Sequence, residues 1–139
     1  MLATDPTAAG SPDPGQRYDP AAAAGVVTRA LGVAGGIDLV LGSLATVPGV
    51  VRTAARTGLF RSHPVRLQVG EWRYEPTADG RLAAAHVVGG IVIAETALSP
   101  EAAGRSVAAA LGQLIDGFGA QILPAVRAVL EGLDVASGR

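Results

Sequence analysis

The segment that most constrains this fold is GVAGGIDLVLGSLATVPGVV, residues 32–51, in which Asp38 is the single charged residue. Such a segment is compatible with three structures: a membrane-spanning helix, a glycine-rich phosphate loop, or a soluble helix that packs on two sides. Its neighbours and its internal spacing distinguish these three.

A phosphate loop fits worst. Dinucleotide-binding loops follow a strand and open a helix, and a P-loop ends in Gly-Lys followed by Ser or Thr. Here a helical segment precedes Gly32, and all eleven basic residues of the chain are arginine. We therefore expect no nucleotide at this segment.

A membrane span fits better but meets a cost. Residues 30–51 are long enough for a hydrocarbon core of about 30 Å, and arginines follow at 52, 56, 61 and 66. However, inserting Asp38 near the middle costs roughly 2.5–3.5 kcal/mol, and five glycines and Pro48 interrupt the stretch. We expect a soluble, internally packed helix, with peripheral membrane attachment as the alternative.

The apolar residues of this region have helical spacing. From Val33 they recur at intervals of 4, 3, 4, 3, 4 and 3 residues, while glycines at 35, 42 and 49 lie on the opposite face. Pro48 is expected to kink or restart the helix. We interpret this seam as a candidate interface consisting of Val33, Ile37, Val40, Leu44, Val47 and Val51.

Cap residues predict further helices at both ends of the chain. Asp19 and Pro20 suit the N-cap and first helical position of a helix that runs to about Ala34. Ser99 and Pro100 repeat this pattern, and Gly117 and Gly119 separate that helix from a last one ending near Leu133.

Between these helices, residues 63–100 read as two β runs around a turn at 76–80, where Asp79-Gly80 suits a positive φ. A change of parity at Gly70-Glu71 predicts a bulge. The return run, 82–96, is apolar on both parities, which predicts cover on both faces or pairing in an oligomer. We interpret Gly89-Gly90 as a bend in one long strand, with a hairpin and a third strand as the alternative.

The predicted fold class is α+β, with N-terminal helices, a central antiparallel β-hairpin and two C-terminal helices packed on the sheet. We expect a disordered tail over residues 1–18, one domain over 19–134 and a short tail over 135–139. The N-terminal residues are acidic and proline-rich, unlike a signal peptide, so we expect a cytoplasmic protein, with membrane association left open.

Composition argues against several functions. The net charge of −1 gives no footprint for nucleic acid, and the absence of cysteine removes thiolate chemistry and cysteine metal sites. The two histidines, His63 and His86, are too few for a zinc site. We expect no metal, no cofactor and no catalytic residue; a weaker alternative is a hydrolase or isomerase using Glu71 or Glu95 with His86.

The short segment EWRYEP concentrates aromatic residues in an aromatic-poor chain. Trp72, Arg73 and Tyr74 are of the residue types that dominate interaction hot spots. A cross-strand aromatic pair that stabilises the hairpin is an equally good interpretation. We include these three residues in the candidate interface.

The segments FRSHPVRLQVGEWRYEP and ADGRLAAAHVVGGIVIAE resemble small uncharacterised actinobacterial proteins of the mycobacterial type, a domain-of-unknown-function group. The resemblance covers about residues 18–133 and brings no catalytic motif. It implies a stand-alone intracellular protein, and the use of arginine without lysine agrees with an actinobacterial origin.

Together these observations predict a non-enzymatic structural or interaction protein that forms a homodimer or higher homo-oligomer. Its two-sided apolar helix and strand would bury against a symmetry mate. The alternative is a carrier or scaffold for an apolar ligand such as a lipid or quinone.

Overall fold

The computed structural model describes residues 17–59 and 62–138. Within them, four α-helices, one 3₁₀-helix and a five-stranded sheet form an α+β fold. The elements are, in chain order, α2 (Pro20–Leu31), α3 (Gly36–Leu44), β1 (Val51–Thr53), β2 (Arg66–Val69), β3 (Trp72–Pro76), β4 (Leu82–Val88), β5 (Ile91–Leu98), α4 (Pro100–Phe118), η2 (Ala120–Ile122) and α5 (Leu123–Ala136).

The sheet is an antiparallel meander in which spatial order follows chain order, β1-β2-β3-β4-β5. The predicted single hairpin is therefore wrong. Gly70-Glu71 is the turn between β2 and β3, because Val69 pairs with Trp72. Gly89-Gly90 is likewise a turn and not a bend, since both glycines have positive φ, 60° and 81°, as a tight two-residue hairpin requires.

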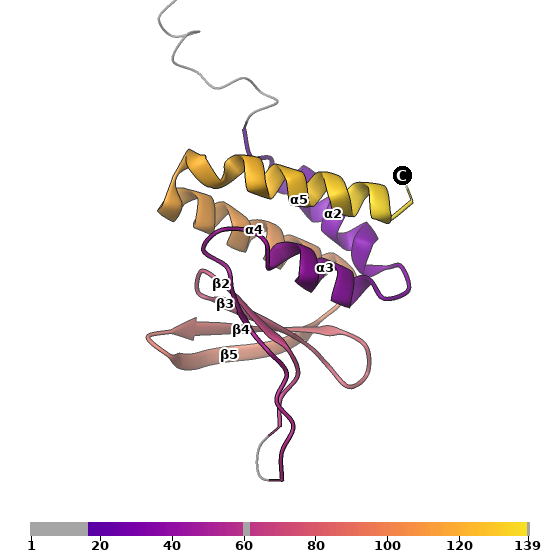
Figure 1. Cartoon of the computed structure of the whole chain (residues 1–139), viewed down its shortest axis with the longest axis vertical. Coiled ribbons are helices and arrows are strands. Elements are labelled where there is room, and N and C mark those ends of the chain that lie inside the picture. The colour runs from indigo at the N-terminus through magenta and orange to yellow at the C-terminus, as the bar shows by residue number, and fades with distance from the viewer. Residues whose placement is uncertain (1–16, 60–61, 139) are drawn as a thin grey trace, which may run out of the picture.

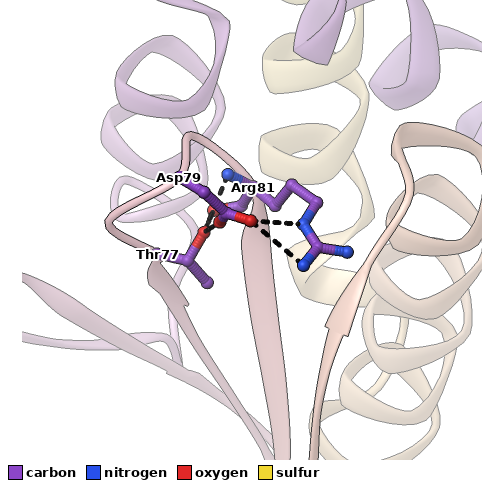
Figure 2. Close-up of polar contacts among 3 residues, drawn as sticks. All are labelled: Thr77, Asp79 and Arg81. Atoms are coloured by element: carbon purple, nitrogen blue, oxygen red, sulfur yellow. Dashed lines mark hydrogen bonds and ion pairs between the residues drawn. The ribbon is translucent and has the colours of Figure 1, made fainter.

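The predicted turn between β3 and β4 is confirmed, and polar side chains hold it (Figure 2). The Thr77 hydroxyl contacts the Asp79 carboxylate and accepts a hydrogen bond of 2.9 Å from the Arg81 backbone N–H. The other Asp79 oxygen, Oδ2, accepts from Arg81 Nε at 3.1 Å. Gly80 supplies the positive φ of 84°.

The helix starts follow the cap residues. Asp19 Oδ1 accepts hydrogen bonds from the backbone N–H groups of Ala21 and Ala22, and Ser99 Oγ accepts from that of Ala102. Tyr18, placed in the tail by the sequence analysis, packs against the core and donates its hydroxyl to the Ala108 carbonyl. Residues 1–16 of the predicted tail lie outside the described residues.

The helix expected to carry the whole apolar seam ends at Leu44, so the predicted continuation to Val51 is wrong. The Thr46 hydroxyl binds the Ser43 carbonyl, and Gly49 has a φ of 90°, which a helix does not contain. The chain then enters β1 at Val51. Another turn lies before α3, where Gly36 is so close to the Ala30 carbonyl that a Cβ would lie 2.1 Å from its oxygen.

All four helices lie on one face of the sheet (Figure 1). Leu67, Val69 and Tyr74 of the sheet share a buried cluster with Val107 and Leu111 of α4. The second C-terminal helix, α5, does not follow the prediction of packing on the sheet; it lies against α2 and α3 and farther from the strands (Figure 1). No described helix covers the opposite face of the sheet.

Candidate functional site

Strand β5 forms one edge of the sheet and is the most exposed apolar element of the fold. Within the described residues it pairs with β4 alone. Ile91, Val92 and Ile93 have relative exposures of 69%, 43% and 63%. Unpaired backbone groups along an apolar edge are a template for another strand. We call Ile91–Thr96, all exposed residues, the β5 edge.

Glu95 is the single charged residue of the β5 edge, and its charge has a partner within the chain. Its carboxylate lies 3.7 Å from Arg73 Nη2. The pair spans Ala85, which lies between them in the strand register, on the face of the sheet away from the helices. The ion pair thus leaves the β5 edge with little unbalanced charge.

A second cluster lies at the end of β3 and β4, on the helix-facing side. The rings of Trp72 and His86 are stacked, with centroids 4.7 Å apart and planes 18° apart. His86 Nε2 lies 3.0 Å from a carboxylate oxygen of Glu71. We call these three residues the Trp72 cluster.

Of the residues in the weaker enzymatic alternative, the structure brings Glu71 and His86 together and separates Glu95 from His86. Glu71 and His86 are in contact. Glu95 pairs with Ala85 in the register, whereas His86 pairs with Ala94. Since successive residues of a strand point to opposite faces, Glu95 and His86 lie on opposite faces of the sheet. Glu71 and Glu95 therefore form no carboxylate pair.

Burial separates the predicted interface residues into two groups. Val40, Leu44, Val47 and Tyr74 are fully buried in the chain's own core. Val33, Ile37, Trp72 and Arg73 are half-buried, and Val51 is 60% exposed. The helical seam thus serves mainly this chain's interior. The candidates that reach the surface lie on the sheet (Val51, Trp72 and Arg73) and around the start of α3 (Val33 and Ile37). Ile91, Val92 and Ile93, which were not among the predicted interface residues, are also exposed on the sheet.

Tyr74 of β3 is a buried core residue whose hydroxyl is hydrogen-bonded. Its hydroxyl is 2.8 Å from Ser106 Oγ. Burial raises the pKa of Tyr74 to about 12, although the hydrogen bond with Ser106 opposes this shift. The hydroxyl therefore remains neutral over the physiological range and acts as a hydrogen-bonding group.

Two further properties concern ligands and membranes. In residues 17–59 and 62–138, no three His, Asp or Glu side chains are grouped so that they could hold a metal ion. None of the helices formed by these residues has the length and apolar character needed to cross a membrane.

Comparison with known proteins identifies a family. Residues 15–135 match the family described as a domain of unknown function, DUF5073. No curated protein and no solved structure matches the chain. The match confirms the resemblance to a domain-of-unknown-function group; the actinobacterial origin stays a prediction.

Proposed function

The chain belongs to the DUF5073 family, and we propose that it is a non-enzymatic structural or interaction protein that assembles with a second copy of itself through the β5 edge. The observation that carries this proposal is the exposure of three consecutive large apolar residues, Ile91, Val92 and Ile93, on an edge strand. Natural sheets usually protect such edges with charges, prolines, bulges or covering elements. Strand β5 carries one charge, Glu95, and a register shift against β4 that leaves Ile93 without a register partner, yet its three large apolar residues remain exposed.

A second copy suits this edge for two reasons. Antiparallel pairing of β5 with β5 about a twofold axis would satisfy the outward backbone groups of both strands with one self-complementary segment. The charge of Glu95 is already paired with Arg73 in each chain, which reduces repulsion between the two copies. The result would be one continuous sheet across the dimer.

The chain contains no cysteine, which permits a direct test. We would introduce one cysteine at a time at positions 91–96 and measure disulfide-linked dimer on a non-reducing gel under mild oxidation. Disulfides need Cβ atoms about 3.5–4.5 Å apart. Pairing about a twofold axis therefore predicts fast cross-linking at the position nearest the axis and slower cross-linking on either side.

Val51→Cys is the matched control, because Val51 is a similarly exposed valine on the other edge strand. Light scattering of the unmodified chain should show a dimer at micromolar concentration. The proposal would be overturned by a monomer at all accessible concentrations, or by uniform cross-linking at 91–96 no faster than at Val51→Cys.

A further inference from the structure

A cavity of about 250 Å³ lies between α4 and the helix-facing side of the sheet. Trp72 of β3, Ala84 of β4, and Ala94 and Thr96 of β5 line it from the sheet. Ala102 and Ser106 line it from α4. All of these residues belong to one chain, so a single copy forms the cavity, although Ala94 and Thr96 also belong to the β5 edge proposed for assembly.

The hollow arises from a local change in side-chain size. Close to it, the interface between α4 and the sheet is filled by large buried residues such as Leu67, Val107 and Leu111. At the cavity, alanines stand at the corresponding places on β4, β5 and α4. The space is open to solvent on the β5 side, where Ala94 and Thr96 are exposed, so a small molecule can reach the indole ring.

The aromatic wall is held in a fixed orientation. His86 stacks on the Trp72 ring, and Glu71 in turn holds the imidazole through its contact with Nε2. A side chain that is positioned before binding loses less conformational freedom when a ligand arrives. Trp72, the one member of the Trp72 cluster that lines the cavity, therefore presents a positioned aromatic ring to it.

The polar side chains that line the cavity, Thr96 and Ser106, carry hydroxyls, and the buried Tyr74 hydroxyl lies behind Ser106. Ser106 Oγ and the Tyr74 hydroxyl share one hydrogen bond. Two hydroxyls carry two protons, so this pair retains one donor and spare acceptor capacity for a further partner. No charged side chain is among the residues that line the cavity, and an ion there would have no compensating charge for its lost hydration.

We infer that this cavity binds a small, neutral aromatic molecule of one or two rings that carries one hydrogen-bonding group, stacked on Trp72 and bound by the Ser106 hydroxyl. A dry protein cavity of about 150 Å³ binds benzene, so the volume is sufficient for such a molecule. It lies below the roughly 300–1,000 Å³ of pockets for larger ligands, which argues against a long-chain lipid or a quinone with a long tail.

Trp72 is the only tryptophan of the chain, so its fluorescence reports on this site alone. The probe is 4-nitrobenzyl alcohol, a neutral one-ring alcohol whose nitro group quenches indole fluorescence on contact. Saturable quenching is expected for the unmodified chain. The charged analogue 4-nitrobenzoate should give only the linear, non-saturating quenching of random collisions.

Two variants fill the cavity from opposite sides, Ala102→Leu on α4 and Ala94→Leu on β5. Each should weaken binding of the alcohol at least tenfold, whereas Ala109→Leu, at an exposed position of the same helix, should leave it unchanged. Circular dichroism would confirm folding, and if one filled variant is unfolded the other decides. Non-saturating quenching in the unmodified chain, equal binding of 4-nitrobenzoate, or undiminished binding in folded filled variants would overturn the inference.

Discussion

The two edge strands of the sheet differ in length, in charge and in exposed apolar surface. Strand β1 has three residues, and a charged residue, Arg52, occupies its centre. Strand β5 has eight residues and begins with Ile-Val-Ile, all exposed. A short, charged edge strand pairs poorly with a strand of another chain, whereas a long apolar edge strand provides both backbone hydrogen-bonding groups and apolar surface for such pairing. In the proposed dimer, β1 ends the sheet and β5 continues it into the second copy.

The largest effect should come from reversing the apolar character of the β5 edge. Ile93→Lys removes about 1.5–3 kcal/mol of apolar burial from each copy on assembly and introduces a charge. Because both copies lose this burial, about 3–6 kcal/mol in all, we expect the dimer Kd to rise by at least about 100-fold. Light scattering over a concentration series would measure it, with Val51→Lys on β1 as the control that leaves the dimer intact. Equal effects of the two substitutions would remove the distinction between the edges.

A smaller effect is expected from the turn that places β5 beside β4. Gly90 has a φ of 81°, which is costly for any residue with a side chain. Gly90→Ala should lower the free energy of unfolding by about 1 kcal/mol, measured by urea denaturation.

Replacing glycine with alanine at position 42 should have the opposite effect on the free energy of unfolding. Gly42 lies within α3 and a Cβ there would meet nothing within 4 Å. Gly42→Ala should therefore raise the free energy of unfolding, by about 0.5–1 kcal/mol. Should Gly90→Ala prove neutral, the turn does not restrain β5 as the structure indicates.

The smallest predicted effect is a pH dependence of the turn between β3 and β4. The hydrogen bond from Thr77 lowers the pKa of Asp79, with Arg81 contributing. A carboxyl with a lowered folded-state pKa stabilises the fold above its unfolded pKa, and this contribution is lost as pH falls through the folded value.

We expect the β3–β4 turn to loosen as pH falls through the folded-state pKa of Asp79. A pH titration followed by NMR should then show a change in the Gly80 amide resonance, and Asp79→Asn should abolish this change. Dimer mass, which depends on apolar residues of β5, should not follow this titration. If the two change together, the β5 edge is coupled to the neighbouring turn.

Local chemistry made the helix starts predictable. Asp19-Pro20 and Ser99-Pro100 each provide an N-cap acceptor followed by proline, and both helices begin there. The turn at Asp79-Gly80 was predictable for the same reason. These features depend on a few adjacent residues, so no knowledge of the remaining chain is needed.

The number of strands was harder to predict. The two-residue turns at Gly70-Glu71 and Gly89-Gly90 leave almost no polar segment between the strands. In the sequence alone, the first therefore resembles a bulge and the second a bend within one strand. The seam spacing correctly selected buried residues such as Val40, Leu44 and Val47. It could not show that α2 and α5 of the same chain would pack against α3, because that depends on contacts between distant segments.

The candidate site was predictable in part. Two-sided apolar character over 82–96 pointed to a need for cover, and EWRYEP drew attention to Trp72. The edge position of β5 and the approach of Ala102 and Ser106 to Trp72 follow from tertiary packing alone.

The meander order of the sheet also has a kinetic consequence. Between β2 and β5, each strand pairs with its sequence neighbour across a short turn, so closing each hairpin costs little chain entropy. The packing of α2 on α4 instead joins segments at opposite ends of the chain. We expect hairpins to form early and the helical layer to close last, so apolar residues on the helix-facing side of the sheet, such as Leu67 and Val69, would be exposed while folding is still under way.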